Sequence, residues 1–144
     1  MLKKKAFTLI DLLIIIAVIF IIFSAMGINI RSLQNEAKIS KVVADIKTLQ
    51  IAVETYYKNF MYEFPPEENY QSVLLEMNPR VLETNLIDPF GKTSTSLYRY
   101  KLSQSNNYYV IYSVGLRRTG DPRINDNGTV VPEGSPIWVS NGHL

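Results

Sequence analysis

The first part of the chain carries a long apolar run that contains a single carboxylate. Every side chain in residues 12–23 is apolar, and widening the run to residues 7–30 adds few polar or small positions: Thr8, Asp11, Ser24, Gly27 and Asn29. A helix of about 24 residues is about 36 Å long, which is sufficient to cross the hydrocarbon core of a bilayer. The pattern therefore predicts a transmembrane half-helix over residues 7–30.

Residues 31–61 show a different pattern, with apolar side chains spaced by three and four and polar side chains between them. The apolar positions are Ile39, Val42, Val43, Ile46, Leu49, Val53, Tyr56, Tyr57 and Phe60. This spacing is typical of an amphipathic helix with one buried stripe. Because no proline precedes Pro65 and only Gly27 could interrupt the helix, we expect one continuous helix from about Thr8 to about Phe60.

Shorter runs after the helix predict a small head. Residues 72–78 are a candidate short helix, and Asp88-Pro89-Phe90-Gly91 fits a type I turn. Residues 97–102 and 108–114 alternate as an antiparallel hairpin would, and residues 137–139 resemble a third strand. The expected fold class is α+β, with the long amino-terminal helix packed on a small antiparallel sheet of about three strands.

The charges of the chain orient the apolar run and argue against a nucleic-acid partner. Three lysines at positions 3–5 precede the run, so the positive-inside rule places the amino terminus in the cytoplasm and the head outside it. The chain has 15 basic and 13 acidic residues; without these three lysines, 12 against 13 leaves a net charge of −1. The tyrosine-rich hairpin is therefore expected to pack between sheet and helix rather than to stack on bases.

The residue types also argue against an enzyme. The chain has no cysteine, and its single histidine is His143. These counts remove thiol chemistry, disulfides and the usual pairs of nucleophile and base. Glu67 and Glu68 lie in a polar loop without an evident partner, so we expect a protein that is not an enzyme.

The segment Lys-Lys-Lys-Ala followed by Phe-Thr-Leu-Ile-Asp-Leu-Leu, residues 3–13, resembles the class III leader of type IV pilins and type II secretion pseudopilins. The resemblance implies that a prepilin peptidase cleaves between Ala6 and Phe7 and that the new amine of Phe7 is methylated. It also implies that Asp11 pairs with the Phe7 amine of a neighbouring subunit during assembly. The family usually has Gly at the position of Ala6 and Glu at that of Asp11. The alternative is a signal-anchor helix with Asp11 at the cytoplasmic interface.

Further segments narrow the resemblance to the major pseudopilins of type II secretion: residues 56–58 with the Tyr-x-Phe-Pro segment at 62–65, residues 88–91 and residues 109–115. This implies a leader at 1–6, a filament-core half-helix at 7–30 and a periplasmic pilin-like head at 31–144. The implied function is a structural subunit of a pseudopilus filament that polymerises from the bacterial inner membrane to drive protein export. The implied partners are copies of the chain, other pseudopilins, inner-membrane assembly proteins, the prepilin peptidase and the membrane.

Two alternative functions remain at this point. One is a type IV pilin, major or minor, in adhesion, motility or DNA uptake. The other is a membrane-tethered binding module that never polymerises.

The resemblance also implies a calcium ion in the loop over residues 115–136. Oxygen donors in this loop, which calcium prefers, are Asp121, Asn125, Asp126 and Asn127. An EF-hand is excluded, because placing Gly128 at its turn position would put Arg123 at the first ligand position. The predicted metal ligands are therefore Asp121, Asn125 and Asp126, and the alternative is a solvated loop with a tight turn at Asn127-Gly128.

Overall fold

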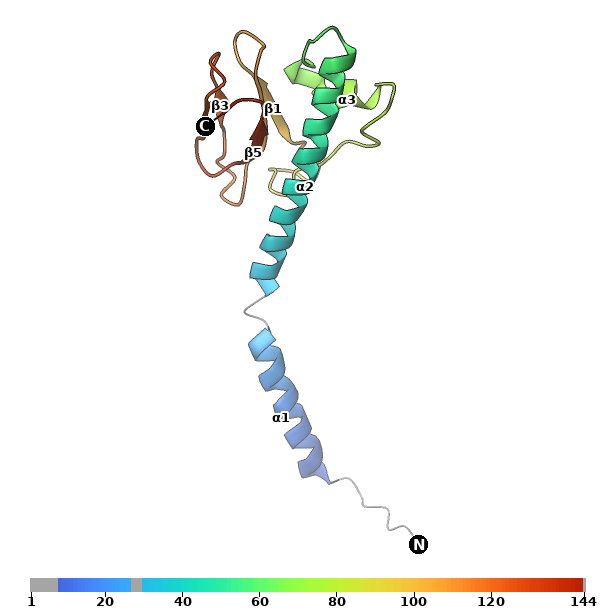
Figure 1. Cartoon of the computed structure of the whole chain (residues 1–144). Coiled ribbons are helices and arrows are strands. Elements are labelled where there is room, and N and C mark those ends of the chain that lie inside the picture. Colours follow the sequence, from blue (N-terminus) through green and yellow to red (C-terminus); the bar gives the residue numbers. More distant parts are fainter. Residues whose placement is uncertain (1–7, 27–29, 144) are drawn as a thin grey trace. The chain divides into compact units, whose positions relative to one another are not determined.

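The structure is a computed structural model that describes residues 8–26 and 30–143 (Figure 1). It divides into two compact units, Met1–Glu36 and Ala37–Leu144. Its two main helices are α1 (Leu9–Met26) and α2 (Ile30–Asn59). The predicted leader at 1–6, the cleavage point at Ala6 and Phe7, and the predicted continuity of the helix through Gly27 fall outside the described residues.

Helix α1 is 18 residues long and apolar on every side. The large apolar side chains described in it are exposed, from Leu9 to Phe23. Within residues 8–26 and 30–143, no helix meets the combined length and hydropathy required of a membrane span. The predicted span over 7–30 includes residues on both sides of α1 that the structure does not describe.

Helix α2 has the predicted amphipathic character. Four of its five buried residues belong to the predicted stripe, Val42, Ile46, Leu49 and Val53, and the fifth is Ala52, which the prediction left out. Val43 and Phe60, which the prediction included, are exposed. The helix ends at Asn59, earlier than the prolines at 65 and 66 require. Met61 and Tyr62 adopt left-handed backbone angles, with φ of 51° and 64°, and the Tyr62 N–H donates to the Tyr57 carbonyl at 3.0 Å. This left-handed turn ends the helix without glycine.

The predicted short helix is present but shifted toward the amino terminus. A 3-10 turn, η1 (Glu67–Asn69), leads directly into α3 (Tyr70–Leu75). Gln71 of α3 is buried and fixes the following loop, because its side chain accepts from the Leu86 N–H at 2.8 Å and donates to the Leu86 carbonyl at 3.2 Å.

The predicted antiparallel sheet of three strands is confirmed. Strands β1 (Arg99–Leu102), β2 (Tyr109–Ser113) and β5 (Ile137–Ser140) lie in the order β1-β2-β5, beside the carboxyl half of α2 (Figure 1). A second pair, β3 (Arg123–Ile124) and β4 (Val130–Val131), was not predicted. Its turn contains Gly128, with φ of +83°.

The sheet has an apolar cluster on each face. One face packs on α2 through Tyr98, Tyr100 and Tyr109. Tyr98 donates to Asp45 of α2 at 2.9 Å, and Tyr109 donates to Glu54 at 3.2 Å. The other face carries a smaller cluster made by Val110, Tyr112, Ile124 and Val130. Tyr98, Tyr100 and Tyr109 thus lie between sheet and helix, as the sequence predicts, whereas Tyr112 lies on the other face.

The predicted turn at Asp88-Pro89-Phe90-Gly91 is confirmed by the Gly91 N–H, which donates to the Asp88 carbonyl at 3.0 Å. The Asp88 side chain is buried and also bonds to residues outside the turn. Its carboxylate accepts from the Phe90 N–H at 2.9 Å, the Ser113 hydroxyl at 2.7 Å and the Val114 N–H at 3.2 Å. This carboxylate therefore ties the loop before β1 to the end of β2.

Candidate functional site

The amino end of α1 holds the carboxylate that the sequence singles out. The Asp11 Oδ2 atom accepts from the Thr8 N–H at 3.0 Å and from the Thr8 hydroxyl at 2.7 Å. In return, the Asp11 N–H approaches the Thr8 hydroxyl oxygen at 3.4 Å. This is a capping box, in which Thr8 is the N-cap and Asp11 takes the position usually occupied by Glu or Gln.

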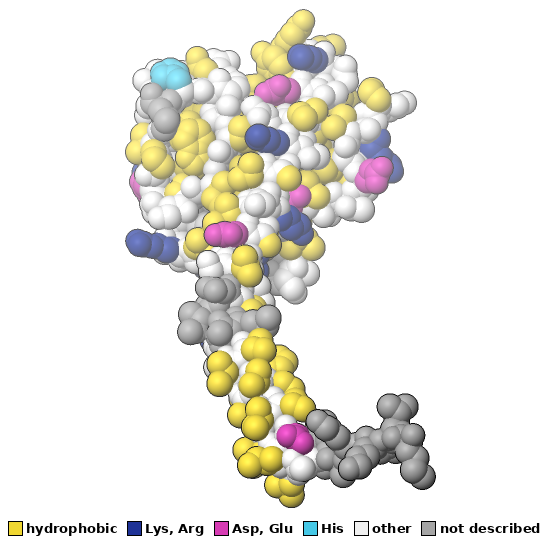
Figure 2. Space-filling view, turned by 60° about the horizontal axis from the view of Figure 1, so that its bottom comes forward, with side chains coloured by type: hydrophobic (Ala, Val, Ile, Leu, Met, Phe, Trp, Pro, Cys, Tyr) yellow, Lys and Arg dark blue, Asp and Glu magenta, His cyan; other side chains and the backbone are white. Residues whose placement is uncertain are grey.

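The two Asp11 oxygens differ in their surroundings. Both Thr8 bonds reach Oδ2, and within the described residues no hydrogen bond reaches Oδ1. The side chains around it are apolar and exposed, including Leu9 at 81 % and Ile10 at 64 %. Figure 2 shows this surface, with hydrophobic side chains along α1 and one acidic side chain near its amino end. Among the described residues, Thr8 thus bonds to Asp11 through Oδ2 alone.

Thr8 is a residue that the sequence reasoning passed over. Its spacing of three from an acid at the start of an apolar run is the signal that would have found it. The capping bonds hold the shorter Asp11 side chain against its own helix terminus. The other predicted processing residues, Ala6 and Phe7, lie outside the described residues.

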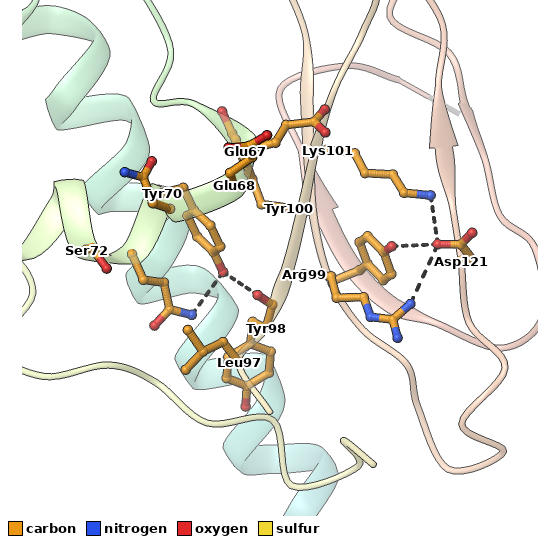
Figure 3. Close-up of a pocket in the computed structure, with 13 residues that line it drawn as sticks. Glu67, Glu68, Tyr70, Ser72, Leu97, Tyr98, Arg99, Tyr100, Lys101 and Asp121 are labelled. Carbon is orange, nitrogen blue, oxygen red and sulfur yellow. Dashed lines mark hydrogen bonds and ion pairs between the residues drawn. The ribbon is translucent and has the colours of Figure 1, made fainter. Parts of the chain in front are cut away.

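The head has an open groove of about 560 Å³ between η1, α3 and β1. At one end, three side chains converge on the Asp121 Oδ1 atom (Figure 3). Lys101 lies at 2.7 Å, the Tyr112 hydroxyl at 2.6 Å and Arg99 at 4.0 Å. The hydrogen bond from Lys101, followed by that from Tyr112, lowers the pKa of Asp121 below its usual value.

The structure does not bring the three predicted calcium ligands into one site. Asp121 faces the Lys101 ammonium in the groove, while Asn125 and Asp126 line a separate hollow with Arg123. The Asp126 Oδ1 atom accepts from the Ser105 N–H at 2.7 Å, which lowers the pKa of Asp126. Within the described residues, no three carboxylate, histidine or cysteine side chains cluster in a manner that could hold a metal. Calcium stays a prediction, and a lysine occupies the place beside Asp121 where a cation would be needed.

No known protein family, characterised protein or solved structure matches this chain significantly. The function is therefore inferred from the residues and from their geometry.

Proposed function

We propose that this protein is a structural subunit of a pseudopilus filament in a type II secretion system, polymerised from the bacterial inner membrane to drive protein export. The observation that carries the proposal is α1, a helix whose large apolar side chains are exposed and whose only acid, Asp11, makes no hydrogen bond through Oδ1 within the described residues. Such a helix is completed by lipid before assembly and by other copies of itself afterwards.

The head supports a pilin-like fold. An amphipathic helix, α2, buries one stripe against a three-stranded antiparallel sheet, and this pairing has its own core. In the proposed assembly, α1 carries the contacts between subunits and the head remains folded throughout. No redox or nucleophilic chemistry is required of it, and we propose that the protein is not an enzyme.

In the proposed assembly step, a prepilin peptidase cleaves between Ala6 and Phe7, and the methylated amine of Phe7 from one subunit pairs with Asp11 of another. A pair of unit charges 4 Å apart is worth about 4 kcal/mol at an effective dielectric constant of 20. Thr8 contributes by holding Oδ2, so that Oδ1 faces the incoming amine. Before assembly, the span lies in the inner membrane with the amino terminus cytoplasmic and the head periplasmic.

The test is electron microscopy of the full chain coexpressed with its assembly machinery. We expect filaments from the wild type and at least tenfold fewer from Asp11→Ala and from Asp11→Asn, because both substitutions remove the negative charge that attracts the amine. Ser24→Ala is the matched control, since it changes a polar residue of α1 that bonds only to its own helix at Phe20. Wild-type numbers of filaments from Asp11→Asn would overturn the pairing.

Mass spectrometry of the purified chain tests the processing step. The expected species begins at Phe7 and carries one methyl group, whereas a signal-anchor helix keeps residues 1–6. Single cysteines introduced along α1 distinguish a filament subunit from a module that never polymerises, because only the subunit crosslinks to itself there. A genetic neighbourhood with a retraction ATPase would favour the alternative of a type IV pilin.

A further inference from the structure

The three-stranded sheet has two outer edges, β1 and β5, and within the described residues side chains of other elements bond to outward backbone groups of the β1 edge but not to those of the β5 edge. At the β1 edge, the Leu102 N–H donates to the Glu67 carboxylate, and the Tyr98 carbonyl accepts from the Tyr70 hydroxyl at 2.7 Å. Both caps come from η1 and α3, which lie along this edge. Proteins commonly cover or block an outer strand in this way, because its unpaired backbone groups otherwise bind another strand.

The β5 edge carries unpaired backbone groups. The Tyr109 N–H points toward β5, where it donates to the Asn141 side chain at 2.8 Å, so alternate residues of β2 face β5. In the register of the sheet, these are Ile111 opposite Val139 and Ser113 opposite Ile137. The N–H and C=O groups of the intervening residues of β5, Trp138 and Ser140, therefore point away from β2. Within residues 8–26 and 30–143, no other segment pairs with these four groups.

The residues along the β5 edge lack the charged side chains that commonly prevent an outer strand from pairing with another strand. Residues 134–142 contain no charged side chain, and only Pro136 at the start of the strand could block an approaching backbone. All four residues of β5 are half-buried. The β3 strand lies against β1 and β2. The turn between β3 and β4 and the start of β4 bond to the chain three residues beyond β5, where the His143 N–H donates to the Gly128 carbonyl at 2.8 Å and the His143 carbonyl accepts from the Val130 N–H at 2.8 Å. Neither bond involves Trp138 or Ser140.

We propose that the β5 edge binds the β5 edge of a second copy of this chain in antiparallel orientation. With Val139 of each copy facing the other, Trp138 of one copy lies opposite Ser140 of its partner, and the four free groups on each side are satisfied. No like charges meet, because the segment is uncharged, and the same residues serve both copies. The two sheets become one sheet of six strands. This contact goes beyond the packing of α1 and does not depend on the proposed filament.

The absence of cysteine from the chain gives a clean test. In the proposed register, Val139 and its symmetry mate form a pair that is not hydrogen-bonded, with Cα atoms about 4.5 Å apart, which a disulfide can span. The full-length chain with Val139→Cys, oxidised in membranes, should give at least tenfold more disulfide-linked dimer than Ser94→Cys. Ser94 is an exposed loop residue of the same head. Equal crosslinking at the two positions would overturn the proposal.

A second pair of variants separates edge pairing from folding. Ser140→Pro, added to Val139→Cys, removes an N–H that faces outward and not one of the bonds to β2, so the head should fold while the dimer falls at least tenfold. Ser140→Ala is the matched control, because it loses the same hydroxyl contact to the Gly142 N–H but keeps its own N–H. Fluorescence of Trp138, the only tryptophan, reports folding in both variants.

Each result of these crosslinking experiments has a separate meaning. A dimer that persists unchanged with Ser140→Pro contradicts the edge pairing, and a disulfide to a different protein contradicts a second copy as the occupant. The crosslink should also survive Asp11→Ala, the change that the filament proposal predicts will abolish assembly. Loss of the crosslink in Asp11→Ala would mean that the contact arises only inside filaments and would overturn its independence from α1.

Discussion

The polar side chains of α1 bond to residues close to them in the sequence, whereas polar side chains of the head bond to residues far away in the sequence. In α1, the polar side chains Thr8, Asp11 and Ser24 bond within three or four residues. In the head, Ser113 bonds to Asp88 across 25 residues and Tyr109 to Glu54 across 55. The apolar residues differ likewise, because those of α2 are buried along one stripe and those of α1 are exposed. The head is thus held together by tertiary contacts, whereas the described side-chain bonds of α1 are local and its large apolar side chains are exposed.

Asp88→Ala, the substitution with the largest expected effect, tests whether the head folds independently of α1. Asp88→Ala leaves the Phe90 N–H, the Ser113 hydroxyl and the Val114 N–H without their shared acceptor. Hydrogen bonds to charged groups contribute about 1.5 to 3 kcal/mol each, and because bonds that share one acceptor are not additive, we expect a loss of at least about 3 kcal/mol. Thermal unfolding of the full chain in detergent, followed by Trp138 fluorescence, should show a Tm lower by more than about 10 °C.

Asp11→Ala is the matched change in α1. This substitution removes a carboxylate that also accepts several hydrogen bonds. We expect the Tm of the head to stay within about 1 °C of the wild type, because the bonds that Asp11 makes within the described residues are local ones to Thr8. A large shift in Tm from Asp11→Ala would mean that the two regions fold together.

The local patterns of the sequence were sufficient for the main elements. The stripe in residues 31–61 predicts α2, and the alternation around residues 97–114 predicts β1 and β2, because both signals depend on side-chain period. The turn at residues 88–91 follows from its four residue types. The pairing of β3 with β4 was missed because strands of two residues have no period to detect; the turn pair Asn127-Gly128 between Ile124 and Val130 was the only signal.

The parts that were not predictable depend on contacts between distant residues or on strained backbone. The bond between Lys101 and Asp121 joins residues 20 positions apart, and the sequence alone assigned Asp121 to calcium. The anchoring role of Asp88 requires knowledge of where β2 ends. The helix ends at Asn59, close to the predicted end near Phe60, but the left-handed angles of Met61 and Tyr62 were not predictable, because residues with a Cβ rarely take them.

Two buried tyrosines of the head, Tyr98 and Tyr100, differ in their hydrogen bonding. The Tyr98 hydroxyl donates to Asp45, whereas the buried Tyr100 hydroxyl has no partner within the described residues. Tyr98→Phe should cost about 1.5 to 3 kcal/mol, because the acceptor is a carboxylate. Tyr100→Phe should be neutral or stabilising by about 1 kcal/mol, since it removes an unsatisfied buried hydroxyl. Unfolding in urea measures both, and equal losses would contradict the difference in bonding.

Acid should weaken the head through Asp121. Its pKa is lowered in the folded protein, chiefly by the hydrogen bond from Lys101, so its contribution is present above the ordinary pKa of about 3.8 and is lost as pH falls through the folded value. Asp126 has a lowered pKa and acts in the same direction. We expect the Tm to fall between pH 5 and pH 3, with a shallower slope in Asp121→Asn. An unchanged slope would mean that the cluster around Lys101 contributes nothing to stability.

The smallest expected effect lies at the carboxyl end of α2. Met61 has a left-handed φ of 51°, and its side chain is 92 % exposed, so the residue adds strain and little packing. A left-handed residue with a Cβ costs about 1 to 2 kcal/mol, and the greater freedom of glycine in the unfolded chain costs about 0.5 to 1 kcal/mol. Met61→Gly should therefore stabilise the head by up to about 1 kcal/mol. Met61→Ala is the control, because it removes the same side chain but retains the strain. A gain from alanine equal to that from glycine would show that the exposed side chain, and not the backbone, is unfavourable.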